Sequence, residues 1–507
     1  MAGDLEVRAR TFVWESDPDL AVEAGWLPPV LWEDLSPGHR DEAVEQADGL
    51  LAELAAAGDE QPFDVLRYHL TCARSTVAHR EIDVLNHMTG PAARLAWAAE
   101  SWPLVADPGA EVYIERLRAF PSYCRDLLRS SADWAVPGSR PVLEAFVAQV
   151  DALVDAQRGG EPPLLRPLLA AGRSVPEEML DNLIVGLLDL RGRAVAAMPS
   201  AYWSSPLPHV PSGTDRYAEA VYRGTSRSMS GEELEALGRD MLGRSQRRFE
   251  ELLFGGLVSQ EPMVSGGYYL DRATEANERL GAALPAVCRD LPEMPCIVVP
   301  MPEAHAAVGP PAFYGPSSRR NGRPGSLFVS TAEPVITREW EVLPLAMHEG
   351  VPGHHLQIAL LDENESIPEV LRLLSVNAFT EGWAVYAERL SGELGLDVGP
   401  VDEFGLIAHQ RWRAVRLVTD VGLHLRGWSV DDAVRFMATN TAQDERAVRR
   451  EVIRYLAWPG QALGYAVGAE TIAAWVAARR AEGTALPDAH ADLLSLGSVP
   501  LSALTGD

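Results

Sequence analysis

Near the middle of the chain, four residues could carry out metal-dependent chemistry: the pair His348-Glu349 and, after a Pro-Gly step, the pair His354-His355. In a His-Glu-x-x-His helix the two histidines are four residues apart, so both imidazoles can bind one zinc ion while the Glu acts as a base. Here the residue four positions after His348 is Pro352, so the plain motif is absent. The residue types are nevertheless those of a metal site with a carboxylate, Glu349, next to one of its candidate ligands.

The spacing of the histidines determines which of them could share a metal ion. His348 and His355 share a helical face but lie roughly 10 Å apart on a straight helix, about the limit for one metal. Pro352 cannot donate to the carbonyl of His348, and Gly353 tolerates unusual backbone angles, so the helix should bulge or kink here. A bulge that absorbs two residues places His354 where the second ligand belongs. We therefore favour His354, with His355 as the alternative.

A zinc site of this kind needs a third protein ligand and an open fourth position for water. The helix-compatible run 377–388 supplies two carboxylates, Glu381 and Glu388, which lie seven residues apart on one face. One of them could bind the metal while the other orients a ligand histidine. The spacing alone leaves both assignments open.

Further along the chain, the helical stretch 402–425 carries Arg416, Asp420 and His424. Asp420 and His424 are four residues apart, so they could pair on one helical face. A structural pair is the simpler interpretation, and a histidine that stabilises a transition state is the alternative. Tyr465 follows a Pro-Gly turn and a glycine, where it could either belong to the core or point into a cleft.

Two segments, His-Glu-Gly-Val-Pro-Gly-His-His-Leu-Gln (348–357) and Thr-Glu-Gly-Trp-Ala-Val-Tyr-Ala-Glu (380–388), resemble the domain-of-unknown-function 885 family. This helical family is similar in pattern to the thermolysin-like and aminopeptidase-N-like zinc peptidases. The resemblance implies that one zinc ion is held by three ligands, namely His348, His354 and Glu381. It also implies that Glu349 is the general base and that Tyr465 donates to the oxyanion.

The resemblance extends over most of the chain. The two metal segments are specific to the family, whereas the other matching segments support it only together: 16–25, 34–37, 323–329, 416–424, 427–428 and 459–465. The family usually has a lysine after the last tyrosine, and this chain has Ala466 there. Any role of that lysine is therefore absent.

The composition limits the classes of function. The chain has 507 residues, of which 47% are hydrophobic, and a net charge of −28. This charge argues against nucleic acid or an anionic membrane as a partner, since both attract a basic face. All 44 basic residues are arginine. Without lysine, Schiff-base chemistry, pyridoxal-phosphate attachment and a Walker lysine are excluded.

The composition also predicts the location of the protein. Four scattered cysteines are too few for a disulfide scaffold and fit a reducing compartment. The first residues lack the apolar segment of a secretion signal, and no run of eighteen apolar residues occurs. These observations predict a cytoplasmic protein. The oligomeric state cannot be predicted.

Apolar periodicity predicts a mostly α protein, with two helical lobes around a deep cleft: residues 1–205 and a catalytic lobe 206–507. Segments 296–301 and 327–331 are β-branched or aromatic and predict a small antiparallel sheet near the metal site. Between them, the Gly/Pro-rich stretch 308–325 carries Tyr314 and forms either a wall of the substrate site or a plain surface loop.

Together these features predict a zinc-dependent metallopeptidase that hydrolyses peptide bonds. Two alternatives remain open: the same site in a biosynthetic amide hydrolase or lyase, and a helical binding protein without catalysis. The candidates for orienting ligands or contacting substrate are His355, Glu388, Asp420, Arg416 and Tyr314, and the candidate catalytic residues are Glu349, Tyr465 and His424.

Overall fold

The structure is a computed structural model that describes residues 2–506, except 59–60, 80–83, 103–106, 131–137, 160–161, 174, 257, 260, 262, 302–309, 320–321 and 334–336. By their contacts the residues form two compact units, each made of several chain segments. Unit 1 contains residues 1–223, 419–436 and 444–461. Unit 2 contains residues 224–418, 437–443 and 462–507. The predicted lobe boundary at residue 205 and the predicted cleft stay predictions.

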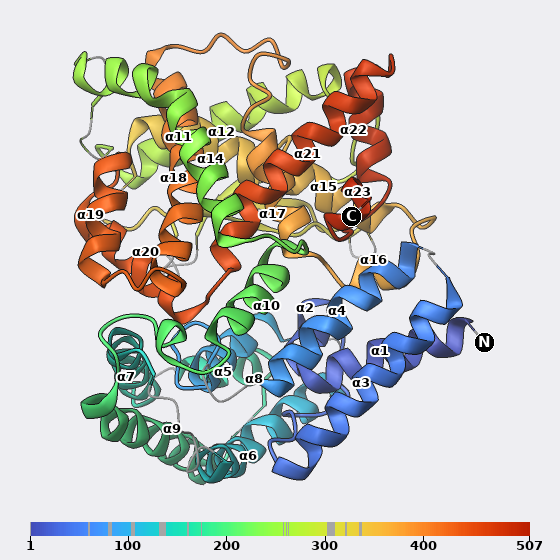
Figure 1. Ribbon diagram of the computed structural model, residues 1–507, viewed down its shortest axis with the longest axis vertical. Helices are drawn as coiled ribbons and strands as arrows, with labels where there is room; N and C mark the ends of the chain where they lie inside the picture. Colours follow the sequence, from blue (N-terminus) through green and yellow to red (C-terminus); the bar gives the residue numbers. More distant parts are fainter. Residues whose placement is uncertain are drawn as a thin grey trace. The chain divides into compact units, whose positions relative to one another are not determined.

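Unit 1 is helical, and part of it packs around an apolar core that includes Leu95, Leu117, Phe146 and Leu187. Figure 1 shows the course of its helices. Its helices are α1 (Ala2–Ser16), α2 (Pro18–Glu23), α3 (Pro37–Ala57), α4 (Gln61–Ala78), α5 (Pro91–Ser101), α6 (Asp107–Ser130), α7 (Arg140–Gln157), α8 (Arg166–Ala170), α9 (Glu177–Ala197), most of α10 (Gly213–Thr225), the first part of α19 (Val430–Asn440) and α20 (Glu445–Ala457). The first half of the chain is therefore helical, as predicted.

Local signals account for the helix boundaries. Helix α3 begins at Pro37, and the Ser36 side chain caps it by accepting from the His39 backbone N–H. Proline suits the first helical turn because its missing N–H would have no partner there. In α7, five apolar residues recur at helical spacing: Leu143, Phe146, Val150 and Val154 are buried, and Val147 is half-buried against the same core.

Unit 2 holds the remaining helices and the sheet. Its helices are α11 (Gly231–Phe254), α12 (Gly266–Ala283), α14 (Val342–Glu349), α15 (His354–Glu363), α16 (Glu369–Leu373), α17 (Asn377–Ala387), α18 (Pro400–His424, whose end from Thr419 belongs to unit 1), α21 (Gly464–Ala481), α22 (Leu486–Leu494) and α23 (Ser502–Thr505). The sequence Ser230-Gly-Glu-Glu233 forms a capping box at the start of α11, with the side chains of Ser230 and Glu233 each accepting from the other's backbone N–H.

The sheet of unit 2 differs from the prediction because it is mixed. It has three strands, β1 (Cys296–Pro300), β2 (Ala312–Gly315) and β3 (Gly325–Val329), in the order β1-β3-β2. Strands β1 and β3 are parallel, whereas β2 is antiparallel to β3. The chain between β1 and β3 is long enough to return to the starting end of the sheet, which permits parallel pairing. Strand β2 arises within the predicted loop, where residues 308–309 and 320–321 lie outside the described residues.

Helices α17 and α21 pack side by side in unit 2 (Figure 1). Glycines allow their backbones to come close. A Cβ atom on Gly382 would lie 2.5 Å from the Cα of Gly468, and one on Gly468 would lie 2.1 Å from the carbonyl oxygen of Ala378. Any side chain at either glycine would force the helices apart. This contact fixes α17, which carries Glu381, against the body of unit 2.

Candidate metal centre

The helical run that begins at Val342 is broken between the histidine pairs. Helix α14 ends at Glu349, and α15 begins at His354. The four residues between them form a turn with a cis Val351–Pro352 peptide bond. A Cβ atom on Gly353 would lie 2.0 Å from the carbonyl oxygen of His348, so the turn folds tightly back on the end of α14. The predicted interruption is present as a full break rather than a bulge.

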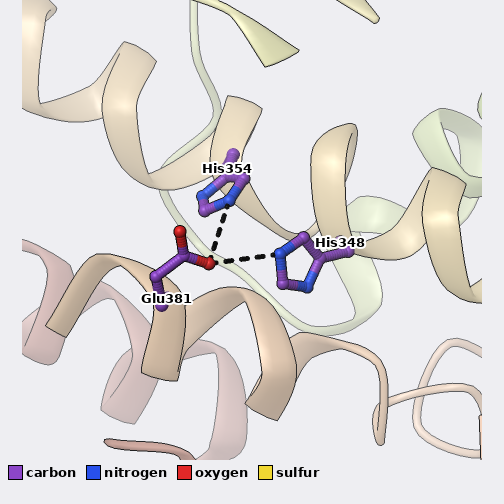
Figure 2. A group of neighbouring side chains, drawn as sticks. All are labelled: His348, His354 and Glu381. Atoms are coloured by element: carbon purple, nitrogen blue, oxygen red, sulfur yellow. Dashed lines mark ion pairs between the residues drawn. The ribbon is translucent and has the colours of Figure 1, made fainter. Parts of the chain in front are cut away.

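This break brings three of the predicted residues together. His348 from α14, His354 from α15 and Glu381 from α17 offer ligand atoms that all lie within 4.8 Å of one another. Oε2 of Glu381 lies 3.4 Å from Nε2 of His348 and 3.6 Å from Nε2 of His354. Figure 2 shows both imidazoles turned toward this one oxygen. Both histidines are buried.

The donor atoms fit a metal ion. Two imidazole nitrogens and one carboxylate oxygen are the ligands that zinc takes in sites with an open fourth position. Oε2 of Glu381 is buried and accepts no hydrogen bond from any described residue. Leaving a buried carboxylate oxygen without a donor is costly. A cation among the three side chains would remove that cost.

Glu388 lies behind His348 and is fully buried. Its Oε1 accepts from Nδ1 of His348 at 2.8 Å, which directs the other ring nitrogen, Nε2, toward Glu381. The guanidinium of Arg413 donates to the same oxygen at 3.0 Å, and Nδ1 of His409 lies 3.9 Å from Oε2. Glu388 is therefore the carboxylate that orients His348. The sequence alone left this role open between Glu381 and Glu388.

The carboxylates control the charge of this cluster. Burial disfavours the charged imidazolium of His348, but Glu381 and Glu388 outweigh it and raise its pKa to about 9. Burial likewise disfavours ionisation of Glu381, yet the two histidines and Arg413 lower its pKa to about 2. Burial lowers the pKa of His354 to about 4. The carboxylates therefore stabilise positive charge at the point where the three side chains meet.

Glu349 is the last residue of α14 and stands next to the ligand cluster without joining it. Burial raises its pKa to about 7, although His348 and a hydrogen bond from the backbone N–H of Tyr314 act in the opposite direction. That N–H belongs to strand β2, so the sheet contacts the predicted base through its backbone. Glu349 is thus held beside the candidate metal ligands.

His355, the alternative ligand, is directed away from the cluster. Its Nε2 bonds the carbonyl oxygen of Met294 at 3.0 Å, and its Nδ1 bonds the hydroxyl of Tyr314 at 3.0 Å. Because the carbonyl only accepts, Nε2 carries the proton and Nδ1 accepts from Tyr314. A Cβ atom on Gly325 would lie 2.4 Å from Nδ1, so His355 is packed against β3 as well. Its contacts attach α15 to the sheet.

Tyr465 and Arg416 lie together in unit 2. The Arg416 guanidinium carbon is 4.5 Å from the centre of the Tyr465 ring, an arrangement typical of a cation–π contact. Tyr465 is half-buried near the start of α21, and Arg416 is buried. The predicted role of Tyr465 at the oxyanion stays a prediction.

The predicted direct pair between Asp420 and His424 is wrong, and both residues lie in unit 1. Asp420 accepts from the hydroxyl of Tyr217 at 2.6 Å and from the backbone N–H of Gly460 at 3.2 Å. His424 bonds Ser205 through Nδ1 and the carbonyl oxygen of Tyr455 through Nε2. The Tyr217 ring also stacks on His424 with ring centres 5.4 Å apart, so Tyr217 contacts both predicted partners. These contacts favour a structural role for His424.

Sequence reasoning missed Arg413, His409 and Trp383. Arg413 and His409 are four residues apart on α18, and both are buried. Two basic side chains four residues apart on one helix were the available signal. Trp383 lies in the family-specific segment 380–388, but its role was not singled out because an aromatic residue in a helix is ordinarily part of the core.

The chain belongs to the family described as bacterial protein of unknown function (DUF885), whose model matches residues 18–506. A sequence comparison with curated proteins finds no match. None of the described helices has the length and apolar character needed to cross a membrane.

Two solved structures share the fold. One is a candidate lipoprotein from Colwellia psychrerythraea, with a TM-score of 0.84 and 21% identity over 99% of this chain and 97% of that one. The other is a candidate lipoprotein of unknown function from Shewanella oneidensis, with a TM-score of 0.73 and 15% identity over 100% of this chain and 99% of that one. At these identities the likeness concerns the fold alone.

Proposed function

We propose that this protein is a zinc-dependent hydrolase that cleaves peptide bonds. The observation that carries the proposal is the convergence of His348, His354 and Glu381 with a base, Glu349, directly beside them. A zinc ion held there would supply a Lewis acid that polarises the scissile carbonyl and lowers the pKa of the attacking water. The His348, His354 and Glu381 set leaves one position open, which suits catalysis better than a closed structural site.

The residues of the chain would handle the proton. Glu349 would accept it from the attacking water and donate it to the leaving amine. The backbone N–H of Tyr314, which acts to lower the pKa of Glu349, would help to orient the base. Glu388 would keep His348 in the tautomer that presents Nε2 to the metal. Tyr465 would donate a hydrogen bond to the oxyanion as it forms.

The experiment pairs metal analysis with one substitution. The purified protein should contain one zinc ion per chain, and a chelator should abolish cleavage of a peptide library. Glu349→Gln keeps the side-chain shape but cannot accept the proton, so it should retain zinc and lose activity by at least roughly a hundredfold. Glu393→Gln, which changes an exposed carboxylate of the same unit, is the control and should behave as wild type.

The outcomes distinguish the alternatives. Loss of zinc in Glu349→Gln would show that Glu349 is a metal ligand. Retained cleavage would show that Glu349 is not the base. Zinc without any peptide cleavage would favour the biosynthetic amide hydrolase or lyase. Absence of zinc or any other bound metal from the wild-type protein would overturn the proposal.

The cytoplasmic location stays a prediction. Both structures with the same fold are described as candidate lipoproteins, so a position at the cell envelope is the alternative that these descriptions suggest. Fractionation of the native bacterium, with detection of the protein in soluble and envelope fractions, separates the two locations.

A further inference from the structure

Three consecutive residues of α17 have three different partners. Glu381 faces His348 and His354, Gly382 packs against Gly468 of α21, and Trp383 contacts the turn between the histidine pairs. Side chains one residue apart leave a helix about 100° apart, so a single turn can reach three neighbours. Helix α17 therefore meets the α14–α15 segment twice, once at the histidines and once at the turn.

The contact with the turn is a specific hydrogen bond. The indole Nε1–H of Trp383 donates to the carbonyl oxygen of Pro352 at 2.8 Å, and Trp383 has no exposed surface. Pro352 is two residues before His354 and four after His348. A bond to its carbonyl therefore fixes the turn whose shape determines the separation of the two imidazoles.

The indole is itself held in place by α22. His490 packs edge-on against Trp383 and against Tyr386, with ring centres 5.3 and 5.5 Å apart. Nδ1 of His490 donates to the carbonyl oxygen of Val287 at 2.6 Å, so its Nε2 accepts from the hydroxyl of Tyr386 at 2.9 Å. Both ring nitrogens are engaged, and the imidazole cannot rotate without breaking a bond. The indole thus has a defined orientation.

We propose that Trp383 is a positioning residue for the metal site: it holds the Pro352 turn so that His348 and His354 converge with Glu381. The inference rests on the metal site of the proposed function. Because Glu381 and Trp383 belong to one helix, the same element supplies a ligand and sets the distance between the other two. Loss of the indole N–H should weaken metal binding even though Trp383 does not touch the metal.

The test measures zinc affinity by competition with a chelator. Trp383→Phe keeps an aromatic ring but removes the donor, and should bind zinc roughly tenfold more weakly, as expected when a group that orients metal ligands is lost. The matched control is Tyr113→Phe, which removes a buried hydrogen bond of the same 2.8 Å length to a backbone carbonyl, that of Leu164 in unit 1. Its zinc affinity should stay within about threefold of wild type, since that bond does not reach the turn.

A second variant separates positioning from bulk packing. In Trp383→His, the imidazole Nε2 occupies the same place in the five-membered ring as the indole Nε1, so the donor is retained while the larger ring is lost. We expect it to melt at a lower temperature than Trp383→Phe yet to bind zinc more tightly. If Trp383 contributed only to packing, zinc affinity and melting temperature would instead fall in the same order in the two Trp383 variants.

The results also separate this inference from the proposed function. A wild-type protein without zinc would refute the metal site itself. Wild-type zinc binding together with unchanged affinity in folded Trp383→Phe would overturn the role of Trp383 alone. If Trp383→Phe does not fold, folded Trp383→His decides: zinc affinity roughly tenfold or more below wild type despite the retained donor would overturn the inference.

Discussion

Two buried networks of histidine and carboxylate side chains differ in how completely their polar atoms are hydrogen-bonded. In unit 1, both ring nitrogens of His424 have partners, and Asp420 accepts from Tyr217 and Gly460. In unit 2, His348 uses one nitrogen to bond Glu388, and its other nitrogen points at an oxygen of Glu381 that accepts no hydrogen bond from the described residues.

The difference shows how a structural network can be told from a candidate functional one. Buried polar atoms are ordinarily satisfied within the protein. The unit 1 network follows this rule and needs no ligand. The unit 2 cluster directs donor atoms of two histidines and one carboxylate at a common point, and its unsatisfied oxygen indicates an external partner. Judged by residue types alone, both networks would be candidate functional sites.

The largest expected difference between the two networks is the loss of zinc when a candidate metal ligand is removed. His354→Ala should abolish stoichiometric zinc binding, because two remaining ligands hold zinc poorly. His355→Ala should retain zinc, since its nitrogens bond Met294 and Tyr314 instead. His424→Gln should retain it too. Metal content after gel filtration measures all three, and loss of zinc in His355→Ala but not in His354→Ala would reverse the assignment.

A smaller effect is expected from the turn between the histidines. In Gly353→Ala the new methyl group would lie 2.0 Å from the carbonyl oxygen of His348, so the backbone at a ligand must shift. Zinc affinity should fall by roughly tenfold or more, together with thermal stability. Gly392→Ala is the control, because nothing lies within 4 Å of its added carbon. Equal zinc affinity in both variants would show that the turn can relax without moving His348.

The smallest effect concerns the network of unit 1 and its response to pH. Burial raises the pKa of Asp420 to about 7, against the opposing hydrogen bonds from Tyr217 and Gly460 and the charge of Arg454. In the unfolded chain the pKa is about 3.9. At pH values between these two pKa values, Asp420 binds more protons in the folded state than in the unfolded chain. Its contribution to the free energy of unfolding therefore falls as pH rises from about 4 to about 7, and does not change at higher pH.

Asp420→Asn keeps a carbonyl oxygen for both donors but cannot ionise. Relative to wild type, its free energy of unfolding should therefore increase as pH rises from 4.5 to 7.5. Urea unfolding at several pH values measures the difference. A difference that does not change with pH would mean that Asp420 is ionised in the folded protein throughout, which would weaken the view of unit 1 as a closed structural network.

The sequence by itself determined the structural features that depend on residues close together in the chain. Ser36 and Ser230 cap the helices that follow them, and apolar spacing identified the buried face of α7. The Pro352-Gly353 step interrupts a helical run because proline lacks a donor and the backbone folds close to His348. These effects are local, so reading the chain in order was enough to find them.

Only the tertiary structure decided which side chains meet across long separations. His354 and His355 are adjacent, yet one joins the cluster and the other bonds Tyr314, because α15 is docked between α17 and the sheet. Arg413 reaches Glu388 from α18, and Trp383 reaches Pro352 from α17. Asp420 and His424 had the right spacing to pair, but Tyr217 supplied a competing partner. Helical spacing tells which residues share a face, whereas the packing of that face against other elements determines what each residue contacts.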